Sequence, residues 1–213
     1  VFDYREGRRV SWEEEREAGL AGEILGSIHA AADSFVSHHS RPRWDLEYMV
    51  DRPLEALRPY FEHRVADWAY LEDVASRLRG RVEKYAAAGL DWGICHGDYN
   101  AKNMHIDAAG GIGVFDFDWC GPGWRARDFQ GVHKAGLHKP SVWSAFLEGY
   151  RVVRPFDDVN LEAVGYFPGL IHLWRLGYAL DGVSEWGSFM LDDARLDVRL
   201  AALRQWDADQ RGR

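Results

Sequence analysis

The sequence predicts a mainly α-helical protein with one small β-hairpin set between its helices. Apolar residues recur at helical spacing over most of the 213 positions. Between Gly93 and Phe117 the pattern changes to short apolar runs separated by turn residues, which is typical of short strands. A hydrophobic content of 46% is enough for one sizeable core in a chain of this length.

Charge and cysteine content exclude several classes of protein. The formal net charge of −8 argues against a surface for nucleic acid or for an anionic membrane, and it suits a cationic ligand or a bound metal ion. Cys95 and Cys120 lie far apart without a C-x-x-C pattern, so neither a disulfide framework nor a zinc cluster is expected. No apolar run approaches the roughly 20 residues that cross a bilayer. We therefore expect a cytoplasmic protein.

The first 90 residues are predicted to be almost entirely helical. "VFDY" at the start resembles the tail of a β-strand, and "REGRRV" a turn. Ser11 and Glu14 have the spacing of a capping box, which predicts a helix over residues 12–35. Residues 36–53 lack periodicity and are predicted to form a loop. A second helical stretch spans residues 54–89, with Pro59 at a start or kink and Gly89 at its end.

A β-hairpin from Met104 to Phe117 follows, with its turn centred between Ala109 and Gly110. This register places Asn103 opposite Asp116 at the open end of two antiparallel strands. The chain then returns to helix, broken by prolines and glycine. The predicted helical segments are 126–136, 140–151, 160–182 and 184–206.

Polar residues gather where the hairpin begins. The loop that carries Asp98 is tied to the open end of the hairpin, so we expect Asp98, Asn103, Asp116 and Asp118 in one small volume. Clustered carboxylates repel one another unless a cation neutralises them, and carboxylate and amide oxygens suit Mg²⁺ rather than zinc. Phosphoryl transfer requires one carboxylate near the acceptor hydroxyl, and a separate carboxylate and amide for Mg²⁺.

The segments "HGDYNAKN" and "VFDFD" resemble the H-G-D-x-x-x-x-N and D-F-D elements of the aminoglycoside phosphotransferase and choline kinase-like superfamily. The resemblance implies a protein kinase-like fold and Mg²⁺-dependent transfer of the ATP γ-phosphoryl group to a hydroxyl of a small molecule. It further implies that Asp98 is the catalytic base, Asn103 a Mg²⁺ ligand and Asp116 the main Mg²⁺ ligand. Asp118 would assist a metal or acceptor site.

The same resemblance implies supporting roles for other positions. His96 would brace the backbone of the loop, and Asp128 in "ARDF" would anchor that loop from beneath. The helix with "LGSIHAA" and His29 is similar to the first helix of the family's C-terminal lobe, and "VFDYREG" is similar to the hinge that enters it.

The resemblance also implies an organisation. Residues 1–10 would be a hinge remnant and residues 11–213 a helical C-terminal lobe, with a catalytic loop at 96–103 and a metal-binding hairpin end at 116–118. A phosphate-covering loop and a strand lysine are not found, and no lysine precedes Lys84. We therefore expect the N-terminal β lobe to be absent from this chain and the isolated chain to have little activity. An exposed interlobe face around Val1, Phe2 and Trp119 would favour self-association.

The acceptor stays open between an aminoglycoside, an amino alcohol, a sugar and, for a stress-response Ser/Thr kinase, a protein. An amine-bearing acceptor would suit a pocket lined by late acidic residues, although solvated helix faces explain these residues almost as well. They are Asp181, Glu185, Asp192 and Asp193. Most tryptophans have helical spacing and are expected in the core rather than in an aromatic cage for a choline-like ligand.

Two other classes of protein remain as alternatives. One is a non-catalytic kinase-like binding module, which the lack of a strand lysine favours and the complete set of acidic motifs disfavours. The other is a metal-dependent hydrolase, which is disfavoured because no histidine or second bridging acid completes a two-metal site. The choice between ATP and GTP, the oligomeric state and the regulation do not follow from the sequence.

Overall fold

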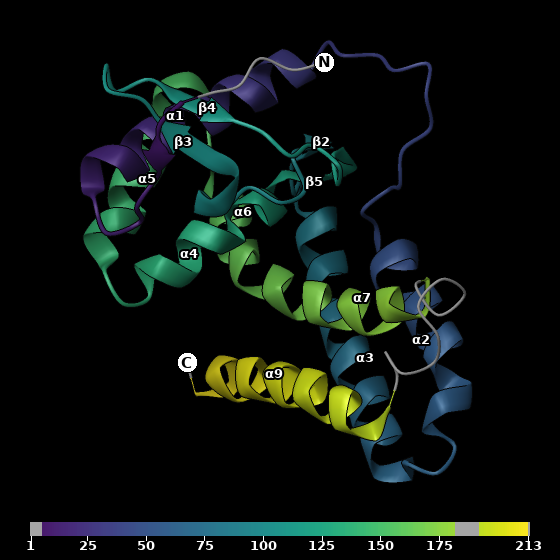
Figure 1. Ribbon diagram of the computed structural model, residues 1–213. Helices are drawn as coiled ribbons and strands as arrows, with labels where there is room; N and C mark the ends of the chain where they lie inside the picture. The colour runs from purple at the N-terminus through teal and green to yellow at the C-terminus, as the bar shows by residue number, and fades with distance from the viewer. Residues whose placement is uncertain (1–5, 182–191, 213) are drawn as a thin grey trace. The chain divides into compact units, whose positions relative to one another are not determined.

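The computed structural model describes residues 6–181 and 192–212, and these form a mostly helical protein with small sheets (Figure 1). The chain divides into two compact units, one built from residues 1–43 and 90–164 and the other from residues 44–89 and 165–213. The predicted strand tail at Val1–Tyr4 lies outside the described residues. No helix within the described ranges has the length and hydropathy needed to cross a membrane.

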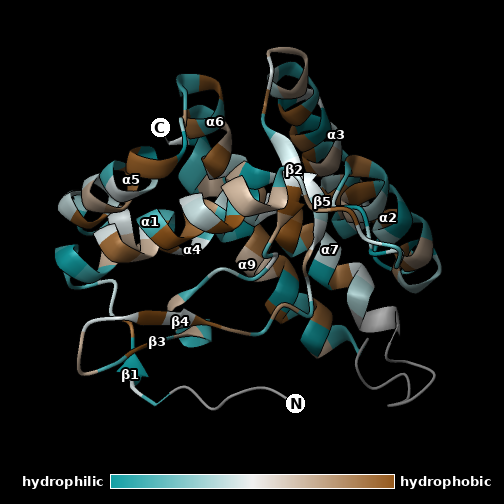
Figure 2. Cartoon of the chain, turned by 90° about the horizontal axis from the view of Figure 1, so that it is seen from above, coloured by the Kyte–Doolittle hydropathy of each residue, from teal (hydrophilic) through white to brown (hydrophobic). Residues whose placement is uncertain are grey.

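The first unit is built around helices α1 (Glu15–Ala32) and α5 (Pro140–Val153), which lie side by side in Figure 1. Brown and teal segments alternate along both helices in Figure 2, as expected of amphipathic helices. Two shorter helices also belong to this unit, α4 (Gln130–Gly136) and α6 (Asp158–Ala163), as do 3₁₀ helices over Ala101–Asn103 and Arg125–Phe129.

Helix α1 begins at Glu15 rather than near Trp12, and the predicted capping box is wrong. The Ser11 hydroxyl accepts a hydrogen bond from the Glu13 amide at 3.1 Å, before the helix starts. The Glu17 carboxylate accepts from the Ser11 amide at 2.8 Å and also pairs with Arg8. Glu17 therefore ties down the segment in front of the helix, and the Ser11 side chain is used in a local turn.

The strands form two small antiparallel sheets in the first unit. Strands β1 (Arg8–Arg9), β3 (Met104–Ile106) and β4 (Ile112–Val114) pair in the order β1-β3-β4. Strand β2 (Trp92–Cys95) pairs with β5 (Gly121–Trp124). The predicted hairpin is confirmed as β3–β4. The sequence did not predict β1 or β5, because "REGRRV" and "CGPGW" contain residues typical of turns.

The hairpin has a different register from the predicted one. Met104 pairs with Val114 and Ile106 with Ile112, which centres the turn on Ala109. The reason is the Asp107 carboxylate, which accepts hydrogen bonds from the amides of Ala109 and Gly111, both at 2.9 Å. This Asx-type turn shifts the pairing of the two strands by one residue from the expected register. Phe115 instead of Asp116 therefore lies opposite Asn103, and its amide donates to the Asn103 carbonyl at 3.1 Å.

The second unit contains helices and no strand among its described residues. Its helices are α2 (Arg52–Leu57), α3 (Val65–Ala87), α7 (Phe167–Asp181) and α9 (Asp193–Arg211). A π-helical turn at Glu47–Asp51 and a 3₁₀ helix at Arg58–Phe61 flank α2. The loop predicted up to residue 53 is therefore wrong from Glu47 onward. The predicted helix over 54–89 is broken before α3, and α3 ends at Ala87, two residues before Gly89, which has a φ of +99°.

Two of the late acidic residues have structural partners in this unit. Asp192 caps α9 by accepting a hydrogen bond from the Arg195 amide at 2.8 Å. Asp193 pairs with His63 and Arg64, both at 3.1 Å. Glu185 and the side chain of Asp181 lie outside the described residues. Trp44 and Trp174 are buried and contact each other in the core of this unit.

Glycines explain how closely α1 and α5 approach each other. A Cβ atom at Gly149 would overlap the backbone of Gly19, and one at Gly22 would overlap the carbonyl oxygen of Phe146. Backbone atoms on both sides leave no flexible side chain that can move aside. By contrast, a Cβ at Gly80 in α3 has no atom within 4 Å.

Gly149→Ala is expected to lower the free energy of unfolding by about 1 to 3 kcal/mol, because the added methyl group overpacks the α1–α5 contact. Gly80→Ala is the matched control. It is expected to be neutral or to stabilise α3 by up to about 1 kcal/mol, because alanine is the better helix former and meets no neighbour. Urea unfolding of the two variants measures both values. Equal stability of the two variants would contradict this description of the helix contact.

Candidate active site

The loop His96–Asn103 leaves strand β2 and passes closely beneath the segment that follows the hairpin. Gly97 has a φ of +89°, and a side chain there would overlap the carbonyl of Trp119. Glycine is required at this position for both reasons. The Tyr99 hydroxyl donates to the Ala21 carbonyl at 2.6 Å, which ties the loop to α1.

A buried carboxylate holds the first turn of this loop. Asp128, in the 3₁₀ helix Arg125–Phe129, accepts hydrogen bonds from the amides of His96 at 2.6 Å and Gly97 at 2.8 Å. Only 1% of Asp128 is exposed. Burial opposes its ionisation, but the hydrogen bond from His29 and the nearby charge of Arg127 outweigh it, so the pKa of Asp128 lies below its usual value. The carboxylate is therefore ionised where it accepts these bonds.

His29 from α1 completes the support of Asp128. Its Nε2 atom lies 3.2 Å from the Asp128 carboxylate and its Nδ1 atom 2.9 Å from the Tyr150 hydroxyl. Burial lowers the pKa of His29, so the ring is neutral. Burial raises the pKa of Tyr150, so its hydroxyl keeps its proton and donates to Nδ1. The His29 proton is therefore on Nε2 and points at Asp128.

His96 joins the loop to the end of the hairpin. Its Nδ1 atom accepts from the Asp98 amide at 3.3 Å, and its Nε2 atom donates to the Phe115 carbonyl at 3.1 Å. Its ring also contacts Phe117, with the ring centroids 4.3 Å apart. The histidine thus holds the residues on both sides of Asp116.

Asp98 and Asn103 are in direct contact across the loop. The Asn103 amide nitrogen donates to the backbone carbonyl of Asp98 at 2.9 Å and to its carboxylate at 2.8 Å. Both amide hydrogens are used in this way, so the Asn103 carbonyl oxygen is the atom left for a cation. Asp98 is partly exposed and Asn103 is buried.

Asp116 has the one positive φ, +66°, among the non-glycine residues described. Aspartate tolerates this left-handed conformation better than most residues, and such outliers concentrate at functional sites. The side chain is exposed and makes no hydrogen bond or ion pair with any residue that the structure describes. Its carboxylate is therefore available to a ligand.

Arg41 was not singled out by the sequence. Its Nη2 atom donates to the backbone carbonyls of Asp118 at 2.5 Å and Phe117 at 3.1 Å. Its Nε atom donates to the backbone carbonyl of Cys120 at 2.9 Å. The Asp118 carboxylate itself is exposed. Arg41 thus fixes the backbone that follows Asp116. It stands in a proline-containing loop without periodicity, so no pattern in the sequence indicated this contact.

The carboxylates do not form the compact cluster predicted from the sequence. No group of three or more His, Cys, Asp or Glu side chains among the described residues has the geometry of a metal site. The Asp98 carboxylate accepts a hydrogen bond from Asn103. The left-handed backbone at Asp116 breaks the alternation of side chains that an extended strand would have. The Asn103 carbonyl oxygen and the Asp116 carboxylate are nevertheless free oxygen donors of the kind that Mg²⁺ prefers, and a Mg²⁺ bound to phosphates typically takes only one or two protein ligands.

A model of the phosphotransferase enzyme family matches residues 1–159 of this chain. That match covers the loop with Asp98 and Asn103, the hairpin with Asp116, and Asp128. The chain belongs to the phosphotransferase enzyme family. The resemblance seen in the sequence is confirmed.

A curated relative matches almost the whole of this chain. An uncharacterised protein of Deinococcus radiodurans is 32% identical over 214 residues, which cover 97% of this chain and 62% of that protein. The chain therefore spans less than two thirds of the length of this relative.

Two solved kinase structures share the fold. A Plasmodium vivax ethanolamine kinase has a TM-score of 0.68 at 14% identity, over 94% of this chain and 64% of that one. An amicoumacin kinase, solved with AMP-PNP, Ca²⁺ and amicoumacin, has a TM-score of 0.65 at 20% identity, over 95% and 64% of the two chains. A kinase-like fold is thereby confirmed, while the prediction that this chain is a C-terminal lobe stays a prediction.

The buried His29 predicts a pH-dependent stability. Because its pKa is lowered in the folded protein, an unfolded chain binds the proton more readily, and stability falls as the pH drops below about 6.5. The contribution of Asp128, whose folded pKa is also lowered, is lost only at lower pH, below about 4.

Urea unfolding at pH 7.5 and 5.5 tests this dependence. His29→Gln should remove as much as about 1.4 kcal/mol from the stability difference between the two pH values, the limit for one histidine that protonates at pH 5.5 only when unfolded. His138→Gln, at an exposed position, is the matched control and should leave the difference nearly unchanged. An unaltered difference in His29→Gln would show that His29 is not held neutral.

Proposed function

We propose that this chain carries the catalytic base and the metal ligands of an ATP-dependent phosphotransferase that acts on a hydroxyl group of a small molecule. The contact that supports this proposal most strongly is the hydrogen bond between Asn103 and the Asp98 carboxylate, in a loop held by Asp128. A carboxylate aimed by an amide and left partly exposed suits a group that receives a proton from an acceptor hydroxyl.

Asp98 would orient the acceptor hydroxyl and take its proton as the hydroxyl oxygen attacks the γ-phosphorus, while the bond from this phosphorus to the β–γ bridging oxygen breaks and ADP leaves. Asn103 restrains Asp98 through its nitrogen, so the carboxylate is positioned before the acceptor arrives. Asn103 and Asp116 would hold Mg²⁺, which when bound offsets the negative charge of the nucleotide phosphates. His96 and Arg41 would keep the segment around Asp116 in place through its backbone carbonyls.

The comparisons support this proposal for the family rather than for one substrate. The amicoumacin kinase structure contains a nucleotide analogue and a divalent cation, which are the two components that the loop and the hairpin end would serve. The acceptor that we propose is an aminoglycoside, an amino alcohol or a sugar. The net charge of −8 favours an acceptor that carries an amine. An N-terminal β lobe that completes the nucleotide site is part of this proposal.

Asp98→Asn is expected to lower kcat by about 10² to 10⁴-fold with little change in the KM for ATP, because general base catalysis is lost while the nucleotide site is kept. Asp116→Ala should instead raise the Mg²⁺ concentration needed for half-maximal rate. The measurement is phosphate transfer from γ-labelled ATP to a panel of amino alcohols, aminoglycosides and sugars, with the natural polypeptide that contains this chain.

Glu72→Gln, an exposed carboxylate-to-amide change in α3, is the matched control and should leave the rate unchanged. A fully active Asp98→Asn variant would contradict the assigned base. Absence of transfer to every acceptor, together with Mg²⁺-independent nucleotide binding, would favour a non-catalytic binding module instead.

A further inference from the structure

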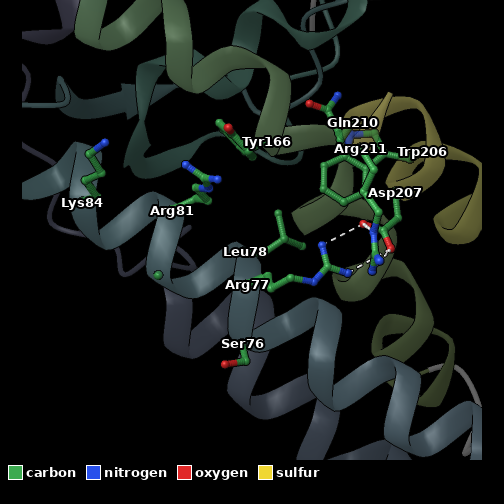
Figure 3. Close-up of a pocket in the computed structure, with 11 residues that line it drawn as sticks. Ser76, Arg77, Leu78, Arg81, Lys84, Tyr166, Trp206, Asp207, Gln210 and Arg211 are labelled. Carbon is green, nitrogen blue, oxygen red and sulfur yellow. Dashed lines mark hydrogen bonds and ion pairs between the residues drawn. The ribbon is translucent and has the colours of Figure 1, made fainter. Parts of the chain in front are cut away.

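A pocket of about 860 Å³ lies within the second unit, between α3 and the end of α9 (Figure 3). Its volume is in the range of small-molecule sites. None of its lining residues belongs to the loop 96–103 or to the hairpin. They are Ser76, Arg77, Leu78, Gly80, Arg81, Lys84, Tyr166, Trp206, Asp207, Gln210 and Arg211.

The lining has an excess of positive charge in a protein of net charge −8. Asp207, which is buried, accepts two hydrogen bonds from Arg77, at 2.8 and 2.9 Å, and two from Arg211, at 3.1 and 3.4 Å. The dashed lines in Figure 3 show the pairing with Arg77. Arg77 and Arg211 are thus already paired with Asp207, and these ion pairs fix one side of the pocket.

Arg81 and Lys84 are different, because neither side chain makes a hydrogen bond or an ion pair with any residue in the described ranges. They are three residues apart on α3, so they project from the same face of the helix. Figure 3 shows both on the side of the pocket away from Asp207. Two neighbouring unpaired cations in a concave site favour a phosphate or carboxylate group.

The aromatic lining is held in place without a ligand. The Trp206 indole nitrogen donates to the Gly165 carbonyl at 3.2 Å, and the ring lies so close to Gly169 that a side chain there would overlap it. Tyr166 packs against Tyr85, with ring centroids 5.8 Å apart. Rings fixed in this way offer a preformed flat surface, which suits a planar ring system.

Gly80 is the second, independent sign of a binding site. It lies inside α3, where glycine is less favourable than alanine. The close helix contacts that require Gly22 and Gly149 do not exist at Gly80, since no atom lies within 4 Å of a Cβ built there. A residue that breaks a local rule without a packing reason points to function, and the space that it leaves open belongs to the pocket.

We propose that this pocket binds a small molecule that joins a phosphate group to a planar ring. Its phosphate would meet Arg81 and Lys84, its ring would lie against Trp206, and the space at Gly80 would admit the part between them. A nucleoside monophosphate has this chemistry and size. The inference concerns a second site and does not rest on the proposed phosphotransferase activity.

Calorimetric titration of the natural polypeptide with AMP tests the proposal. The protein carries Asp116→Ala throughout, to reduce metal-dependent nucleotide binding at the candidate active site. AMP is expected to bind with a Kd below about 1 mM, and adenosine and inorganic phosphate at least about tenfold more weakly. Arg81→Gln with Lys84→Gln should weaken AMP binding at least about tenfold, because two charge-assisted hydrogen bonds are lost.

Lys134→Gln with Arg175→Gln removes two exposed cations outside the pocket and should leave AMP binding unchanged. Gly80→Gln should also weaken AMP binding by about tenfold, because its side chain enters the pocket, while the melting temperature is kept or raised.

Three results would overturn the proposal. They are no AMP binding at 5 mM, on the order of the weakest relevant affinities; AMP binding no tighter than that of adenosine or phosphate; and the same AMP affinity in the pocket variants as in the control.

Discussion

Both oxygens of the Asp128 carboxylate accept hydrogen bonds from backbone amides of the loop that carries Asp98, and one of them also contacts His29. An ionised carboxylate with almost no exposure is tolerated only when its hydrogen-bonding capacity is met. The loop and the helices therefore stabilise each other through this group. Without it, two amides and a histidine nitrogen would be left buried and unpaired, and the turn at Gly97 would lose its support.

Contacts extend from the Asp128 carboxylate in two directions. Toward the core, His29 and Tyr150 connect Asp128 to α1 and α5, whose close approach depends on glycines. Toward the hairpin, the His96 ring donates a hydrogen bond to the carbonyl of Phe115 and so links the loop to the end of the hairpin. Asp116 is then exposed on a restrained backbone, without a partner among the described residues. The Asp116 carboxylate, which we propose as a metal ligand, is thus held by its neighbours' backbone rather than by contacts of its own.

The sequence predicted the family and the hairpin better than the geometry of the candidate site. Asp98, Asn103 and Asp116 stand in short motifs whose spacing indicates phosphoryl transfer, and the hairpin follows from strand alternation and turn residues. The register was missed because the Asp107 side chain selects a turn one residue out of step with the expected one. The role of Arg41 depends on residues nearly 80 positions away, and no local pattern encodes such a contact.

Helix boundaries and the second unit show the same limit. The Glu17 carboxylate accepts a hydrogen bond from the Ser11 amide, and the predicted capping box between Ser11 and Glu14 does not form. Residue spacing alone does not decide between these two local hydrogen-bonding patterns. The pocket lined by Arg81 and Lys84 was not predicted, because its lining joins α3 to a helix more than a hundred residues later. Gly80, a glycine inside a helical pattern, was the one local signal of that pocket.

Amide hydrogen exchange at His96 and Gly97 tests most directly whether Asp128 holds the loop. In the unaltered protein both amides should exchange slowly, because each is bonded to a buried carboxylate. In Asp128→Asn, whose side chain has one acceptor oxygen in place of two, at least one of the two should exchange at least about tenfold faster while the amides within α5 keep their protection. Unchanged protection at both positions would contradict the account, since the loop would then be held by something other than Asp128.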